Sequence, residues 1–547
     1  MATSCDKSFC SNYLLLNLEE VGLVDLFRLL FSASLEHRKF VDSSASIEQI
    51  FYRRWIIFMS IVVQKLLLSV AKPLAWVGST IELWLNLVRI NGGSVGSLLL
   101  NFIRGKKVVK PDKASAEFVS LIGNIDGRVD FDSNIRPGDE RYHAQLAMMS
   151  SKASYENEAC IKSTVTDHWK MEFLGFYDFW NGKKVVKPDK ASAEFVSLIG
   201  NIDGRVDFDS NIRPGDERYH AQLAMMSSKA SYENEACIKS TVTDHWKEKA
   251  TTQAFMLCDK DLDSDTIVVA FRGTEPFDSE AWCTDFDISW YELPGLGTLH
   301  GGFMKALGLQ RSSGWPKELT SGSNNAKGNS NHYFHPPTAY YFIREKLRAL
   351  LHEDSRSRYI VTGHSLGGAL AILFPAILAL HEEKELLDRL EGVYTFGQPR
   401  VGDREFGKFM QKVVSDHHIA YHRLVYCNDV VPRLPYDDTT FLFKHFGKCR
   451  YYDRHYDERI LQDQPNKNYF SLRSVIPMTL NAMHELVRSF TIASIEGPDY
   501  REGTLMRILR VIGLLVPGIP AHCPVDYVNS IRLSQAYGDV TVKEKDA

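Results

Sequence analysis

The sequence carries no large excess of charge of either sign. Its 547 residues include 64 basic and 68 acidic side chains, for a formal net charge of −4. A nucleic-acid-binding surface is normally strongly basic. We therefore expect no nucleic-acid partner.

Cysteine is scarce, and the opening residues do not have the pattern of a secretory leader. The nine cysteines are an odd number without CxxC spacing, which indicates neither a disulfide framework nor a thiolate metal site. The opening residues MATSCDKSFCSNY lack the basic start, apolar core and small-residue cleavage site of a signal peptide. We expect a protein that faces the cytosol and binds no metal.

The apolar amino-terminal segment 1–104 lacks the uncharged run of about 20 residues that a membrane-spanning helix needs. Between Trp55 and Lys72 the polar side chains fall on one half of a helical wheel, which leaves a continuous apolar arc. Pro73 ends or bends this helix. We expect a helical extension that lies on a lipid surface, dips into it as a hairpin, spans it, or packs on the rest of the protein.

Residues 105–170 recur without a single difference as residues 182–247. Repeat architectures normally need three or more units, and their copies diverge, so the identity indicates a recent duplication or a gene-model artefact. Removing 182–247 joins the aromatic-rich segment after the first copy to an uninterrupted domain. We predict a domain made of 105–181 and 248–547, with 182–247 as an insertion. One copy is expected to pack and the other to loop out.

The stretch RYIVTGHSLGGALAI, residues 358–372, places a serine between a predicted strand and a predicted helix. The residues before it favour a strand, and the apolar run 369–381 favours a buried helix. A G-x-S-x-G turn in this context lifts a nucleophilic hydroxyl off the sheet. We predict Ser365 as the nucleophile. The turn residues of this elbow are Gly363, His364 and Gly367.

An acyl-transfer enzyme also needs donors for the oxyanion and an acid to orient the base. The strand-like TIVVAFRGT ends at Thr274, whose backbone N–H forms a natural pair of donors with that of Leu366. Alternating strands and helices predict a parallel sheet with functional residues at the carboxyl ends of its strands. Asp429 ends such a strand, AYHRLVYCND, and is the candidate acid.

The base is expected downstream of the acid if the order is Ser, Asp, His. The candidates are His445, His455, His484 and His522. His484 lies in a helical pattern, and His445 and His455 lie in charged, tyrosine-rich sequence. His522 lies in a loop between apolar elements, which suits a base held between packed elements.

Together, FRGT, HGGF, GHSLGGAL, TFGQPRVGD and NDVVPRLP, in this order over roughly 253–533, resemble the class 3 lipase family of α/β-hydrolases. The segment FRGTEPFDSEAWCTDFDISWYELPG and the apolar extension are similar to plant oil-body triacylglycerol lipases. The resemblance implies an α/β-hydrolase fold with a mostly parallel central sheet. It also implies a Ser365–Asp429–His522 triad and an oxyanion hole at Thr274 and Leu366, with no cofactor.

The resemblance further implies a lid after FRGT, over about 275–290. Its aromatic side chains would cover the site in water and turn to lipid; these are Phe277, Trp282, Phe286 and Trp290. A packed loop is the alternative.

The implied activity is hydrolysis of triacylglycerol to fatty acids and partial glycerides at a lipid–water interface. Phospholipid or galactolipid acyl hydrolysis stays open, because a triad does not distinguish these substrates. A catalytically silent lipid-droplet coat or tether protein is the alternative of another class. The expected partners are an acylglycerol and a lipid-droplet or membrane surface on the cytosolic side, and no protein partner is indicated.

Overall fold

The computed structural model describes residues 12–16, 18, 22, 41–43, 47–106, 108–178, 253–260, 265–275, 278–309, 339–354, 356–435, 443–467, 469 and 472–534. The chain divides into one unit of residues 1–177 and 254–547 and another of residues 178–253. The description below concerns the first unit. The predicted insertion 182–247 lies outside the described residues.

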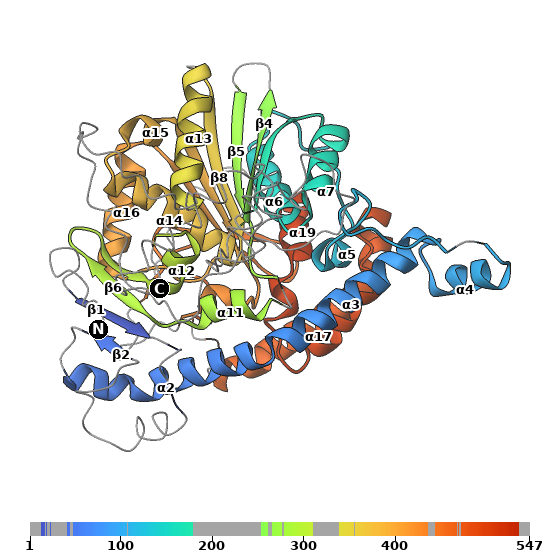
Figure 1. Cartoon of the computed structure of the whole chain (residues 1–547), viewed down its shortest axis with the longest axis horizontal. Coiled ribbons are helices and arrows are strands. Elements are labelled where there is room, and N and C mark those ends of the chain that lie inside the picture. The colour runs from blue at the N-terminus through green and yellow to red at the C-terminus, as the bar shows by residue number, and fades with distance from the viewer. Residues whose placement is uncertain are drawn as a thin grey trace, which may run out of the picture. The chain divides into compact units, whose positions relative to one another are not determined.

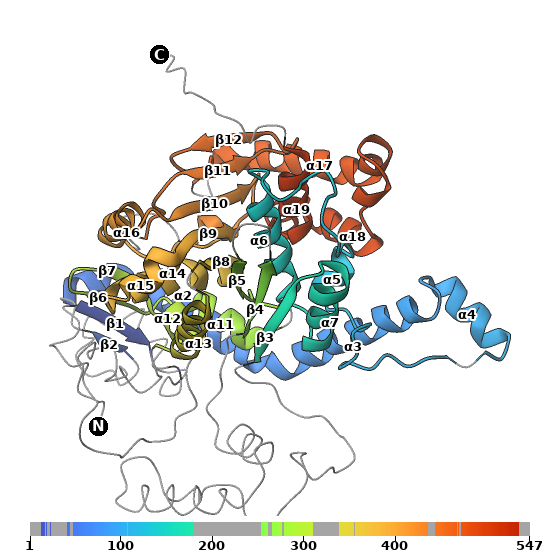
Figure 2. The same ribbon diagram turned by 90° about the horizontal axis from the view of Figure 1, so that it is seen from above.

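An eight-stranded sheet forms the centre of this unit (Figures 1 and 2). The strand order is β12-β11-β10-β9-β8-β5-β4-β3, and the run from β5 through β11 is parallel, with β4 and β12 antiparallel to their neighbours. The strands are β3 (Glu172–Asp178), β4 (Gln253–Lys260), β5 (Asp265–Phe271), β8 (Arg358–His364), β9 (Leu390–Phe396), β10 (Ala420–Tyr426), β11 (Cys449–Tyr452) and β12 (Glu458–Leu461). The expected fold class, α/β with a mostly parallel sheet, is confirmed.

Helices cover both faces of this sheet, because its central strands are apolar on both sides. One hydrophobic cluster joins the sheet to α12 (Gly301–Ala306), α13 (Ala339–Glu353), α14 (Leu366–Leu380), α15 (Lys384–Arg389) and α16 (Arg404–Asp416). A second joins the other face to α6 (Tyr142–Ala153), α7 (Glu158–Ser163) and α19 (Pro524–Leu533). The core is therefore a three-layer arrangement.

The first repeat copy is part of this core. It supplies the short α5 (Leu121–Ile125), then α6 and α7 and the π-helical turn Thr164–His168. Leu146 in α6 and Ile161 in α7 are almost completely buried. The side chain of Arg128 donates to Asn529 Oδ1 of α19 at 2.6 Å. The first copy thus packs against the carboxyl-terminal helices.

A small antiparallel sheet joins the amino-terminal segment to the rest of the unit. Its order is β2 (Val41–Ser43), β1 (Asn12–Leu16), β6 (Trp290–Leu293) and β7 (Gly297–His300). Leu14 and Leu16 are buried there, since alternate residues of a strand point to the same face. The extension was expected to be helical, and its first described residues instead form strands.

The rest of the extension is helical, with α2 (Ile47–Ser69), α3 (Ala71–Ile90) and α4 (Val95–Ile103). Among the described residues, no single helix is long and apolar enough to cross a membrane; α2 from Ile57 and α3 pass that test only as a pair bent by 57°. The bend falls just before Pro73, which lies in the first turn of α3, where proline is tolerated. α2 also packs on the domain, because Ile57 and Ile61 are buried with Leu14.

Two further helices fill the long interval between β12 and α19. They are α17 (Leu472–Ile495) and α18 (Thr504–Ile512). Leu505 and Leu509 of α18 pack in one cluster with Ile81 and Leu85 of α3. The helix α18 therefore packs against the amino-terminal extension, and α17 packs on α18.

Candidate active site

Ser365 lies at a sharp turn between β8 and α14. Its backbone has φ +60° and ψ −129°, a region that residues with a Cβ rarely adopt. A Cβ on Gly363 would lie 2.1 Å from the carbonyl carbon of Gly367, and one on Gly367 would lie 2.3 Å from the carbonyl oxygen of Phe271. The two glycines therefore allow α14 to start directly beside β5 and β8, as the predicted elbow requires.

Asp429 and His522, which are 93 positions apart, form a pair in which Asp429 is buried and His522 is partly buried. The His522 Nδ1 atom lies 2.9 Å from Asp429 Oδ2 and 3.0 Å from Oδ1. Asp429 also accepts hydrogen bonds from the Val431 backbone N–H at 2.9 Å and from the Tyr527 hydroxyl at 2.5 Å. These donors hold the carboxylate so that it orients the imidazole.

The geometry separates His522 from the other three candidate histidines. His445 donates from Nε2 to the carbonyl of Pro432 at 2.7 Å, and the His455 ring lies against His484 with the ring centroids 4.7 Å apart. When His522 donates from Nδ1 to Asp429, its Nε2 carries the lone pair. That Nε2 atom is buried and has no hydrogen-bond partner among the described residues, so it is available to accept a proton.

His364, predicted only as a turn residue, contacts the backbone of His522. Its Nε2–H donates to the His522 carbonyl at 2.8 Å, and its Nδ1 accepts from the Tyr155 hydroxyl at 2.9 Å. The two imidazole rings stack with centroids 4.6 Å apart. Burial, with a contribution from the His522 charge, holds the pKa of His364 well below its usual value. His364 is therefore neutral and fixes the segment that carries His522.

Tyr155 was missed in the sequence because it lies in the repeat, far from every motif. It belongs to the first copy, and a Cβ on Gly273 would lie 2.1 Å from its hydroxyl oxygen. Gly273 thus leaves room for Tyr155 beneath the FRGT segment.

The predicted oxyanion residues lie at the starts of two adjacent connections. Thr274 follows β5 and is buried, and Leu366 is the first residue of α14. The Thr274 hydroxyl donates to Asp285 Oδ2 at 2.8 Å. Burial raises the pKa of Asp285 to about 7, against the opposing effects of that hydrogen bond and of the His522 charge. Asp285 was also missed, because an acid within an acidic aromatic segment has no distinctive local pattern.

The predicted lid region contains a helix, α11 (Ser279–Phe286). Trp282 is half-buried, and Phe286 is exposed with its ring centroid 6.3 Å from that of Trp282. Trp290 lies instead in β6, paired with Leu14 of the extension, and Phe277 lies outside the described residues. The expected lid is thus divided between a helix and a sheet strand.

The helix α11 rests on the amino-terminal extension. The Ser60 hydroxyl of α2 donates to the Phe286 carbonyl at 2.7 Å, and the Cys283 thiol lies 3.6 Å from the Gln64 carbonyl oxygen. Any displacement of α11 must therefore break contacts with α2.

Within the described ranges, no group of three or more His, Cys, Asp or Glu side chains is placed to hold a metal ion. The candidate residues are a serine hydroxyl at a strand–helix turn, an imidazole paired with a buried carboxylate, and backbone N–H groups after two neighbouring strands. These are the groups that covalent acyl transfer uses.

Comparison with known proteins identifies the family. Residues 268–439 match the family model described as Lipase (class 3). Triacylglycerol lipase OBL1 of Nicotiana tabacum is 39% identical over 545 residues, covering 88% of this chain and 84% of the relative. The proteins of that name from Arabidopsis thaliana and Ricinus communis are 37% and 32% identical, covering 96% and 97% of this chain and 95% and 96% of the relatives. The chain belongs to the class 3 lipase family.

Proposed function

We propose that this protein is a serine ester hydrolase that converts triacylglycerol to fatty acids and partial glycerides at a lipid–water interface. The observation that carries the proposal is the Asp429–His522 pair at 2.9 Å, in a chain whose Ser365 occupies a strained strand–helix turn. The names of the three relatives that match over most of their length support triacylglycerol as the substrate.

In the proposed reaction, His522 Nε2 accepts the hydroxyl proton of Ser365 as the oxygen attacks an ester carbonyl. Asp429 stabilises the imidazolium, and the backbone N–H groups of Thr274 and Leu366 stabilise the oxyanion. His522 then donates the proton to the departing glyceride oxygen. Water repeats the sequence on the acyl-enzyme and releases the fatty acid.

We propose that the reaction takes place on a lipid droplet or membrane surface that faces the cytosol. The support is the amino-terminal extension, whose exposed side chains are mostly apolar over three helices, with Lys72 and Arg89 as charged exceptions. Trp76 is 70% exposed and Phe102 is 73% exposed, and contiguous exposure of this kind marks a surface that binds something apolar.

Fatty-acid release from emulsified triolein by the full-length protein tests the activity. We expect Ser365→Ala and His522→Ala each to lower the rate by about 10³-fold or more. The control His455→Ala changes an exposed histidine that does not pair with Asp429. It should keep the wild-type rate of fatty-acid release.

Hydrolysis that survives Ser365→Ala would refute the nucleophile. Activity on phospholipid or galactolipid but not on triolein would favour the acyl-hydrolase alternative. Emulsion binding without hydrolysis of any ester would favour the coat or tether protein.

A further inference from the structure

Among the described side chains of the helix α17, the charged ones lie inside and most of the exposed ones are apolar. Glu485 and Arg488 are buried, with 2% and 9% exposure. Ten residues are exposed between 475 and 495, and none is charged: Val475, Ile476, Pro477, Leu480, Met483, Val487, Phe490, Thr491, Ser494 and Ile495. A surface helix of a water-soluble protein has the opposite arrangement.

The helix α18 and the turn after it continue this pattern toward the candidate site, except at Arg507, which is half-buried with its guanidinium 4.5 Å from the centroid of the Phe490 ring. Arg510 is 1% exposed, whereas the apolar side chains Ile508, Val511, Ile512, Leu515, Val516 and Ile519 point outward, and Leu515 reaches 86% exposure. His522 follows three residues after Ile519. We call the exposed apolar residues of 475–495 and 508–519 the docking face.

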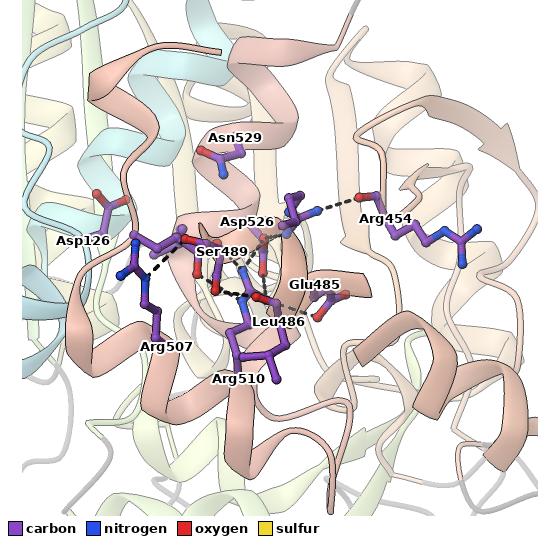
Figure 3. Close-up of polar contacts among 12 residues, drawn as sticks. Asp126, Arg454, Glu485, Leu486, Ser489, Arg507, Arg510, Asp526 and Asn529 are labelled. Carbon is purple, nitrogen blue, oxygen red and sulfur yellow. Dashed lines mark hydrogen bonds and ion pairs between the residues drawn. The ribbon is translucent and has the colours of Figure 1, made fainter. Parts of the chain in front are cut away.

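The charges behind the docking face form one ionic cluster (Figure 3). The Arg510 guanidinium contacts Glu485 at 3.1 Å, Glu502 at 2.9 Å and Asp526 at 2.8 Å. Arg488 also contacts Asp526, at 2.8 Å. Asp526 belongs to α19 and lies four positions after His522. The cluster therefore ties both helices of the docking face to the helix that follows the catalytic histidine.

This arrangement is the one that helices in contact with lipid adopt. Desolvating several charges is costly, and in lipid the charged side chains turn inward and pair while apolar side chains face outward. Leu505 and Leu509 of α18 pack with Ile81 of α3, so the docking face adjoins the apolar amino-terminal extension. In Figure 1 both α3 and α17 lie along the lower edge. A lipid layer would thus meet both regions.

We propose that the docking face binds the surface of a phospholipid-coated triacylglycerol droplet and that the ionic cluster holds His522 in a fixed position relative to that surface. This rests on the proposed function, because it places the substrate layer beside the base. The other possible occupant is a second copy of the chain, since Ile476, Leu480, Met483, Val487 and Phe490 follow the spacing of a helix-pairing seam.

Flotation of the full-length protein with a triolein emulsion stabilised by phosphatidylcholine tests the proposal. Binding is measured in a Ser365→Ala background, so that the droplets are not consumed. We expect the triple variant Ile476→Glu, Leu480→Glu, Val487→Glu to reduce the bound fraction relative to free protein by about tenfold or more. Glutamate keeps helix propensity high, and near-ultraviolet circular dichroism verifies the fold.

The control is Ile460→Glu, which makes the same kind of substitution once, adding one charge where the triple variant adds three, at an isoleucine of β12 that is 52% exposed. It should float as the parent does. With Ser365 present, the triple variant should lower the ratio of triolein hydrolysis to hydrolysis of a soluble short-chain ester, and Ile460→Glu should not.

Flotation of the triple variant equal to that of the parent would overturn the proposal. The proposal would also be overturned if the triple variant were a monomer and the parent a dimer in sedimentation velocity, with flotation unchanged. That result would assign the docking face to a second copy of the chain. A parent protein that hydrolyses neither ester would refute the proposed function while flotation still decides the docking face.

Discussion

At the scale of single residues, the candidate site combines strain with unusual protonation. Ser365 has φ +60° with a Cβ, which costs about 1–3 kcal/mol where the surroundings impose it. The Ser365 N–H donates to the Phe396 carbonyl at 2.9 Å, so a neighbouring strand holds the turn. Next to it, burial keeps the pKa of His364 low and raises that of Asp285 to about 7.

Asp285→Asn tests this environment through stability. The ordinary pKa of the carboxyl is 3.8, and the folded value is about 7. The folded protein therefore holds the proton to higher pH than the unfolded chain, and its stability falls as pH rises through that interval. Asparagine still accepts from Thr274 but does not ionise. We expect the variant to gain in thermal unfolding temperature over wild type between about pH 4 and about pH 8.

The control for this measurement is Asp499→Asn, which removes an exposed carboxyl elsewhere. The thermal unfolding temperature of this control should stay close to that of wild type at both ends of the pH range. Parallel pH responses of wild type and Asp285→Asn would contradict the prediction.

At the scale of elements, adjacent parallel strands place the candidate site residues at one edge of the sheet. Ser365 follows β8, Gly397 follows β9, Asp429 follows β10 by three residues, and Thr274 follows β5 by three residues. The carboxyl ends of parallel strands meet at one edge of the sheet. Gly397 has φ +61°, and a Cβ there would lie 2.8 Å from Asp429 Oδ2 and 2.9 Å from His522 Nδ1.

Gly397→Ala is expected to displace the Asp429–His522 pair. A displacement of about 1 Å can cost on the order of 10²-fold in rate, and we expect kcat on a soluble ester to fall by about that factor. The control is Gly295→Ala at φ +78°, where the added Cβ meets nothing within 4 Å. Both variants carry the backbone penalty, so equal activities would show that the clash has no effect on the pair.

At the scale of the whole molecule, the hydrophobic core depends on a segment that the sequence contains twice. The first copy contributes Leu146, Ile161 and Val165 to the cluster beneath the sheet, and it supplies the Tyr155 hydroxyl at His364. Residues 105–170, the first copy, make these contacts. That residues 182–247, the identical second copy, are an insertion remains a prediction.

Leu146→Ala and Leu223→Ala change equivalent leucines of the two copies. Leu146 is 1% exposed in α6, and truncation of such a side chain costs about 2–5 kcal/mol. We expect the free energy of unfolding to fall by that amount for Leu146→Ala and to stay unchanged for Leu223→Ala. Equal losses in the two variants, measured by denaturant unfolding, would mean that both copies contribute to the core.

Much of the candidate site was predictable because its signals are local. The glycines around Ser365 and the strand before Asp429 are short patterns, set by the backbone geometry that each residue type allows. His522 was chosen among four histidines by its loop and by family resemblance. Its contact with Asp429 depends on 93 intervening positions, which no local pattern describes.

The sequence by itself determined the α/β class, the elbow at Ser365 and the apolar character of the extension, because periodicity and turn chemistry act over a few residues. Only the tertiary structure decided that Tyr155 and Asp285 join the site, that β1 pairs with β6, and that α17 faces outward with its apolar side. These outcomes depend on which distant surfaces bury one another. Burial of that kind is a property of the packed chain and not of any single segment.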